Sequence, residues 1–310
     1  MNFVLVLVLT FLVCVKSEFA VTQDIIDDIN SSGAKWIAGH NQFSKMTIEE
    51  AKMLMGVKTS SGIQDEHDSK KLDNTRLSAS LPSSFDWREN STCKSLHHIS
   101  KSGQCAAGWA VGAVEAFSDR VCIHSKGAIT AQFSAQQLLD CDHLCHMMIE
   151  CDEGCKGGVP ITAWNYLAET GTPVEQCYPY TSGEGEAGRC KQYCADGSEK
   201  KLYKAKTAYF VEPTTEEMKY DILNYGPIQA DFMVFRDFTA YTSGVYEQHS
   251  HDQLGKAAVK ILGWGVEKDV EYWLCANSWG TSWGESGFFK IRIGECGIND
   301  HPVAGIPFVY

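Results

Sequence analysis

The sequence has little positive charge and, beyond its first residues, no long apolar run. Lys and Arg number 27 against 39 Asp and Glu, which gives a formal net charge of −12. A nucleic acid or an anionic membrane surface would need a basic patch, so neither is expected as the main partner. No second apolar run of 18 residues follows, so no membrane-spanning helix is expected in the mature chain. The sequence also shows no internal repeat and no low-complexity tract, so nothing points to a repeat protein.

The N-terminus has the pattern of a secretory signal. The apolar run from Phe3 to Val15 is too short to span a bilayer, and Val15 and Ser17 occupy the −3 and −1 positions of a cleavage site. We therefore predict a signal peptide over residues 1–17 and a protein that is secreted, extracellular or lysosomal. Asn30 and Asn90 begin glycosylation sequons, which fits the same route.

The rest of the chain divides into a short leading segment and one globular unit. Apolar residues fall at helical spacing over residues 21–57, and residues 58–80 are polar, as in an exposed linker. We interpret residues 18–80 as a detachable pro-segment and expect the globular unit to cover 81–310. Its first half is helical in character, with candidates at 110–121, 131–140 and 162–169, and it becomes β-rich beyond Tyr203. This order predicts an α+β protein with a cleft between two halves.

Three short motifs resemble those of papain-like cysteine proteases. Residues 105–110, Cys-Ala-Ala-Gly-Trp-Ala, are similar to the family's Cys-Gly-Ser-Cys-Trp-Ala, and residues 155–158 and 277–280 resemble its Cys-Asn-Gly-Gly and Asn-Ser-Trp-Gly. Stretches at 36–41, 112–120, 243–246, 261–267 and 303–307 narrow the resemblance to the cathepsin B-like branch. It implies a papain-like two-lobed fold, with a helical left lobe, a β-barrel-like right lobe and a cleft between them. It also implies that residues 18–80 are a cathepsin B-type propeptide.

The chemistry of that family needs groups that this sequence lacks. Such an enzyme uses a thiolate at a helix N-terminus, an imidazole oriented by an Asn, and a Gln that helps to hold the oxyanion. Aligned on its motifs, the chain has Gly108 at the nucleophile position, Ala257 at the His position and Ser102 at the Gln position. Asn277 alone is retained. The resemblance therefore predicts a peptidase fold without an intact catalytic set.

Other side chains are poor substitutes for the missing groups. Cys105 is implied to be half of a disulfide, and Cys275 is far in sequence from the helix terminus. His249 and His251 fall in the stretch before the strand that holds Ala257, where ordinary exposed histidines are expected. A compensating nucleophile or base remains the weaker alternative.

The cysteine content indicates disulfides. With Cys14 in the signal peptide, 12 of the 13 cysteines remain, an even number in a chain bound for an oxidising compartment. The spacing of Cys141, Cys145, Cys151 and Cys155 could suit zinc, but the secretory signal opposes a metal site, and no metal or other cofactor is expected. Cys275 and Cys296 are left over, as free thiols or a sixth pair. The resemblance implies the pairs Cys93–Cys122, Cys105–Cys155, Cys141–Cys190, Cys145–Cys151 and Cys177–Cys194.

Binding features of the family persist beside the lost chemistry. Gly157 and Gly158 resemble the glycines that admit a substrate backbone to the cleft, and Trp279 resembles the aromatic on its primed side. His301 falls where the cathepsin B-like branch often has an acidic residue in a side-chain pocket. We therefore predict a monomeric, inactive homologue that binds peptides, cystatin-like inhibitors or another protein. The alternatives are a weak or unconventional cysteine peptidase and a purely structural extracellular protein.

Overall fold

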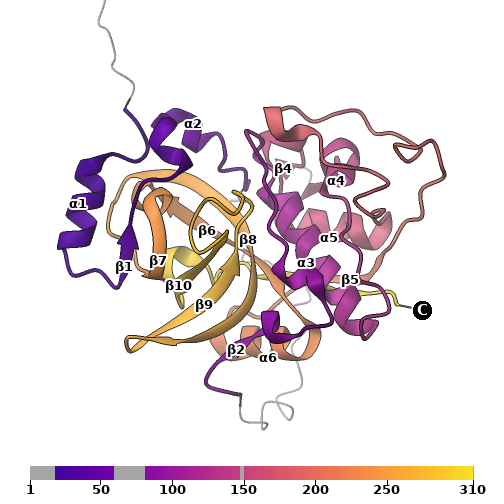
Figure 1. Cartoon of the computed structure of the whole chain (residues 1–310). Helices are drawn as coiled ribbons and strands as arrows, with labels where there is room; N and C mark the ends of the chain where they lie inside the picture. Colours follow the sequence, from indigo (N-terminus) through magenta and orange to yellow (C-terminus); the bar gives the residue numbers. More distant parts are fainter. Residues whose placement is uncertain (1–17, 59–80, 147–149, 310) are drawn as a thin grey trace, which may run out of the picture.

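The computed structural model describes residues 18–58, 81–146 and 150–309. The predicted signal peptide and most of the predicted linker lie outside these residues. Figure 1 shows two lobes side by side, with the helices α3, α4 and α5 in one and the strands β6 to β10 in the other. The predicted α+β arrangement with two lobes is confirmed.

The β lobe is built on one curved sheet. Among the described residues nine strands belong to it, in the order β1-β7-β10-β9-β8-β6-β11-β5, with β2 paired to β8. Strand β8 is the longest described strand, and it pairs with β6 along residues 253–261 and with β9 along residues 260–267. The strands are β1 Trp36–Ala38, β2 Phe85–Asp86, β5 Ala205–Phe210, β6 Ile228–Phe235, β7 Tyr241–Tyr246, β8 Gln253–Glu267, β9 Val270–Ala276, β10 Phe288–Arg292 and β11 Val303–Pro307.

The helical lobe is arranged around α3, Gly108–His124. Fourteen of its residues, Trp109 through Cys122, are buried, because α4, α5 and the strands β8 and β11 surround it. Helix α4, Ala135–Cys141, begins later than the predicted residue 131 because the Ser134 hydroxyl accepts the amide hydrogen of Gln137 and caps it there. Helix α5 is Pro160–Glu169. Strand β3, Cys145–His146, pairs antiparallel with β4, Glu150–Cys151. Helix α6, Thr215–Tyr225, packs against β8.

The pro-segment folds onto the β lobe (Figure 1). It contains the helices α1, Gln23–Ser31, and α2, Ile48–Lys52. Its apolar spacing predicted helices alone, but residues 36–38 form strand β1, which pairs antiparallel with β7. The strand forms because β7 offers an open sheet edge and because Trp36, 2% exposed, is buried beside Tyr246.

The described residues contain five disulfides, and these are the pairs that the resemblance implies: Cys93–Cys122, Cys105–Cys155, Cys141–Cys190, Cys145–Cys151 and Cys177–Cys194. The four cysteines considered for zinc are therefore all consumed in disulfide bonds. Cys275 and Cys296, which the sequence left open, are free thiols.

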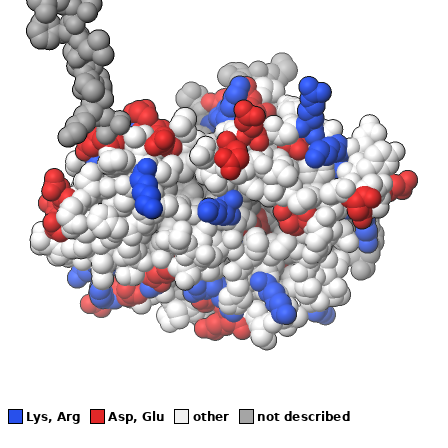
Figure 2. All heavy atoms as spheres, turned by 45° about the horizontal axis from the view of Figure 1, so that its top comes forward, with Lys and Arg blue, Asp and Glu red and all other residues white. Residues whose placement is uncertain are grey.

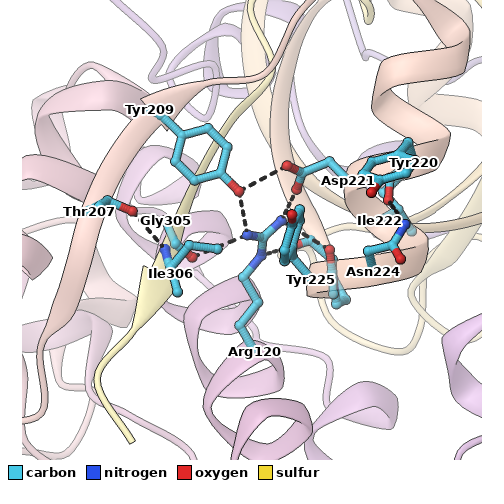
Figure 3. A network of polar contacts seen from close by, with 12 residues as sticks. Arg120, Thr207, Tyr209, Tyr220, Asp221, Ile222, Asn224, Tyr225, Gly305 and Ile306 are labelled. Carbon is cyan, nitrogen blue, oxygen red and sulfur yellow. Dashed lines mark hydrogen bonds and ion pairs between the residues drawn. The ribbon is translucent and has the colours of Figure 1, made fainter. Parts of the chain in front are cut away.

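Two buried cations fix α3 against the β lobe. Arg120 donates hydrogen bonds to the carbonyl oxygens of Pro227, Gly226 and Gly305, at 2.7, 3.1 and 3.1 Å, and its guanidinium also contacts Tyr209 and Asp221 (Figure 3). Strand β8 supplies the second cation, Lys260. Its Nζ lies 2.8 Å from Asp119 Oδ2 and 3.8 Å from Glu115 Oε2. Neither Arg120 nor Lys260 has any exposed surface. A buried charge of this kind persists only when it is paired and hydrogen-bonded.

The face drawn in Figure 2 has no large basic patch of the kind that a nucleic acid or an anionic membrane would need. Its Lys and Arg side chains are separated from one another, and acidic side chains lie between them. Across the described residues, no helix combines the length and the apolar character that a bilayer span requires.

Replacing Arg120 tests the anchoring of α3. We expect Arg120→Ala to lower the free energy of unfolding by about 3–5 kcal/mol, because it leaves Asp221 and three carbonyl oxygens buried without their donor. Arg292→Ala is the control, because this side chain is 58% exposed and its pair with Glu247 is worth about 0–1 kcal/mol. Urea unfolding of both variants measures the difference, and equal losses would contradict the anchoring role.

Candidate functional site

The N-terminus of α3 lies where the two lobes meet. Gly108 is the first residue of this helix, and the preceding residue, Ala107, supplies no side-chain cap. A β-carbon at Gly108 would lie 3.2 Å from the carbonyl oxygen of Ala258 and 3.9 Å from Ser278 Oγ. The helix therefore points its free amide groups, and the positive end of its dipole, at the loop after β9 and at strand β8. Because residue 108 is glycine, no side chain lies at this helix terminus.

The other positions named from the resemblance surround the same point. Ala257 is buried on β8, directly before the Ala258 that faces Gly108, and lies opposite Phe232 of β6. The amide of Ser102 donates to the carbonyl oxygen of Ser278 at 2.9 Å. Asn277 immediately precedes Ser278 and is 1% exposed. The fold thus gathers all four positions, which carry Ser, Gly, Ala and Asn.

Two polar atoms in this cluster are buried without a hydrogen-bond partner in the described part of the chain. One is the Ser102 hydroxyl, and the other is Nδ2 of Asn277, whose Oδ1 accepts from the amide of Ser278 at 2.8 Å. An unsatisfied buried polar group costs about 1–3 kcal/mol, so such groups are rare in folded proteins.

The free thiols do not supply a replacement nucleophile. Cys105 is bonded to Cys155. Cys275 lies in the core of the β lobe with no exposed surface, and burial raises the pKa of its thiol well above the ordinary value. Burial, together with Glu295 and Asp237, also raises the pKa of Cys296. Since the thiolate is the reactive form, neither described free cysteine is activated.

The histidines proposed as substitutes are engaged elsewhere. Nε2 of His249 lies 2.8 Å from Asp28 Oδ2 of helix α1, and Nδ1 of His251 lies 3.2 Å from Nε2 of Gln248. Both rings are exposed on the loop between β7 and β8. Neither is presented to Gly108.

The pro-segment runs through the cleft as an extended strand. The amide of Gly158 donates to the Gly56 carbonyl at 2.9 Å, and the amide of Lys58 donates to the Gly158 carbonyl at 3.0 Å, a parallel bridge. On its other side, the Val57 amide donates to the Lys256 carbonyl of β8 at 3.1 Å. Residues 56–58 are therefore hydrogen-bonded to both lobes, and we call them the strap.

Glycine is required beside the strap. Gly157 has a φ of +105°, and a β-carbon there would lie 2.4 Å from the Gly56 carbonyl oxygen. A β-carbon at Gly158 would lie 2.5 Å from Asp152 Oδ1 and from the Trp109 ring. Only a residue without a side chain lets an extended backbone come this close.

The pro-segment also covers Trp279. The ring of Phe43 packs edge-on against it with centroids 4.8 Å apart, and Nε2 of Gln42 donates to its carbonyl oxygen at 3.0 Å. Trp279 is 5% exposed as a result of this cover and of its packing on Trp283. The strap and Phe43 thus occupy the two features that the sequence assigned to peptide binding.

His301 lies at the edge of a small charged group that the sequence reasoning missed. Its Nδ1 is 3.9 Å from Asp231 Oδ1, and the side chain is 45% exposed. Asp231 is buried and pairs with Lys256 Nζ at 3.0 Å. The signal that could have found Asp231 is that it is the charged residue in the mainly apolar strand Ile228–Phe235.

A second missed feature is a buried pair of carboxyl groups behind Gly158. Asp142 accepts from the amide of Leu144, and Asp152 accepts from the amide of Val159 at 2.7 Å. Their remaining oxygens have no donor in the described residues, and the two carboxyl groups contact each other. Burial and the neighbouring Asp152 raise the pKa of Asp142 to about 9, and burial raises the pKa of Asp152 to about 6. At neutral pH the pair therefore shares a proton.

Comparison with known proteins decides the family. A family model described as papain family cysteine protease matches residues 81–306, and a model of the peptidase family C1 propeptide matches residues 21–61. The chain belongs to the papain family.

The relatives of this papain-family chain include cathepsin B-like proteins. It is 38% identical to the cathepsin B-like cysteine proteinase 5 of Caenorhabditis elegans, over 92% of this chain and 90% of that protein. It is 34% identical to the cathepsin B-like cysteine proteinase of Schistosoma japonicum, over 84% and 83%. The solved structure of proCathepsin B S9 from Trypanosoma congolense matches with a TM-score of 0.85 at 32% identity, over 94% of this chain and 99% of that one.

The carboxyl pair predicts that stability falls as the pH rises. A carboxyl whose pKa is raised in the folded state stabilises the fold fully below its unfolded pKa of about 4, and this contribution is lost as the pH rises through the folded values. Between pH 5 and pH 9 we expect the free energy of unfolding to fall by about 1 kcal/mol per pH unit or less. Tyr166, Glu169 and Lys58 are the other titratable groups that influence the pair.

Urea unfolding across this pH range measures the effect. Asp142→Asn should flatten the dependence, because the amide keeps a hydrogen bond without a charge to release. Glu89→Gln, at an exposed carboxyl, is the control and should leave the slope unchanged. A slope that persists in Asp142→Asn would show that the pair does not cause it.

Proposed function

We propose that this papain-family protein is catalytically inactive and acts by binding ligands in its cleft. The observation that carries the proposal is Gly108, which puts no side chain at the N-terminus of α3, where a β-carbon would face Ala258 and Ser278. The raised thiol pKa values of Cys275 and Cys296 support it, because no other described cysteine is free to react.

The magnitude of the loss favours inactivity over weak activity. In the serine protease system, removing a member of the triad leaves a residual acceleration of about 10³–10⁴ over water, which comes from the oxyanion hole and binding. Losing an oxyanion donor costs a further factor of about 10²–10³. With Ala257 and Ser102 in place of His and Gln, this chain lacks the base and the donor side chain as well as the thiol.

The strap indicates what kind of ligand the cleft accepts. Gly158 offers an amide and a carbonyl to an extended backbone, and both are used by residues 56 and 58. A peptide, or the extended segment of a cystatin-like inhibitor, can use the same two groups once the pro-segment has left. Because self-cleavage is not expected, a different protease in the secretory or lysosomal route would have to remove it.

Activity measurements on the processed protein test the loss of catalysis. We expect no turnover of fluorogenic peptides and no labelling by an epoxide inhibitor. Gly108→Cys alone should stay nearly inactive, because no imidazole stands at position 257. Gly108→Cys combined with Ala257→His and Ser102→Gln should gain measurable turnover, about 10²-fold or more above the single change.

The control for this repair is Gly108→Ala with the same two partner changes, which fills the space beside Ala258 without supplying a thiol. It should be inactive. Inhibitor-sensitive turnover by the unaltered protein, or high activity from Gly108→Cys alone, would overturn the proposal.

Binding measurements test the cleft. A cystatin should bind the protein after proteolytic removal of the pro-segment and bind the full chain at least about tenfold more weakly, because the strap occupies Gly158. Gly158→Arg should abolish binding to the processed protein, since even a β-carbon there meets Trp109 and Asp152. Val266→Arg, at a 54% exposed position, is the control. Equal binding by Gly158→Arg would show that the cystatin does not use Gly158, and no binding by the processed unaltered protein would favour a purely structural protein.

A further inference from the structure

A cavity lies beside α3, away from the strap and from the residues that contact it. It has a volume of about 220 Å³ and is enclosed by the loop His98–Ser102, by α3 and by the segments that hold Gln132 and Glu175. This volume is about seven times the ~30 Å³ share of a water molecule in the liquid. The cavity is therefore the size of a small organic group rather than of a single solvent molecule.

The cavity is lined both by apolar side chains and by polar or charged ones. Its apolar and aromatic side chains are Ile99, Val111, Val114, Phe133, Ala135 and Tyr180. Two carboxylates, Glu115 and Glu175, and the Ser102 hydroxyl also line it. The hydroxyl is one of the buried atoms that has no hydrogen-bond partner among the described residues, and Ser102 is 4% exposed. An apolar wall beside acceptors suits a ligand with a short aliphatic stem and a donor group at its end.

The two carboxylates differ in how they are satisfied. Glu115 accepts from the amide and hydroxyl of Ser100, at 3.1 and 2.7 Å, and lies 3.8 Å from the ammonium group of Lys260. Among the described residues, Glu175 accepts from the amide of Tyr180, at 2.8 Å through Oε1, and has no other hydrogen-bond donor. Within the part of the chain that the structure describes, no cation lies within 4 Å of Glu175.

A partly buried carboxylate without a cation is an unusual arrangement. Burial raises the pKa of Glu175 above the ordinary value, because the charged form is held away from water. The basic residues that line the cavity are His98 and Lys101, and neither has an ion pair with Glu115 or Glu175 among the described residues. Oε2 of Glu175 thus remains available as an acceptor for a positively charged donor.

We propose that this cavity binds an alkylguanidinium or alkylammonium group, whose aliphatic stem packs on Val111 and Val114 and whose charged end pairs with Glu175. The group can come from a free small amine or from an arginine or lysine side chain of a peptide. The site is separate from peptide binding on Gly158, because none of the cavity's residues contacts the strap.

Calorimetric titration of the full chain with N-butylguanidine tests the proposal. We expect saturable binding at one site, and no binding of N-butylurea, which has the same shape without the charge. Glu175→Gln should weaken the affinity for N-butylguanidine about tenfold or more, since a hydrogen bond to a charged group is lost. This variant should fold, because the Gln oxygen can still accept from the Tyr180 amide.

Two further variants keep the outcome unambiguous. Glu184→Gln, at an exposed carboxylate outside the cavity, should bind as the unaltered protein does. Ala135→Met fills the cavity from its apolar side and should also weaken binding. Equal affinity for N-butylurea, or unchanged affinity in Glu175→Gln, would overturn the proposal.

The same titration distinguishes the two sources of the group. A blocked Gly-Arg-Gly peptide that binds more tightly than N-butylguanidine would assign the site to a side chain presented by a polypeptide. A peptide that fails to compete with bound N-butylguanidine would assign it to a free small cation. Failure of both probes would overturn this proposal and leave the proposal for the cleft unaffected.

Discussion

The burial of two cations against α3 is the constraint on which the rest of the structure depends. Arg120 and Lys260 have no exposed surface, and each is paired with carboxylates across the boundary between the lobes. A buried charge that loses its partner is strongly destabilising, so the helix cannot shift along its axis or rotate without breaking several contacts at once. The position of Gly108, at the start of this helix, is fixed by that restraint rather than by catalysis. Without the contacts of Arg120 and Lys260, one lobe could slide along the other.

The same helix serves both of the proposed binding regions. Its first turn faces β8 and the loop after β9, and the Trp109 indole donates to the Gly154 carbonyl at 3.0 Å, which supports the glycine stretch beside the strap. One turn further along, α3 forms a wall of the cavity beside it, through Val111, Val114 and Glu115. Glu115 also lies near Lys260, so the ion pair that holds the lobes together shapes this cavity as well.

In the proposed function, the cleft holds an extended chain without cutting it. Backbone recognition at Gly158 depends on one amide, one carbonyl and the absence of side chains, and the strap uses all of these. Bond cleavage in this family needs a thiolate, an imidazole and an amide donor, and positions 108, 257 and 102 carry Gly, Ala and Ser instead.

Much of this protein could be predicted from local sequence, and the remainder could not for identifiable reasons. The apolar stripe along α3, the motifs around Cys105 and Asn277, and the gaps at Gly108 and Ala257 are all visible in sequence because each depends on residue type and spacing. The sequence alone thus determined the two-lobed α+β class and the loss of the expected side chains. Strand β1, the strap beside Gly158, the Asp142 and Asp152 pair and the unpaired Glu175 were decided only by tertiary structure. Each depends on burial or on contact between residues far apart in the chain, and neither periodicity nor spacing encodes which distant groups will share one desolvated space.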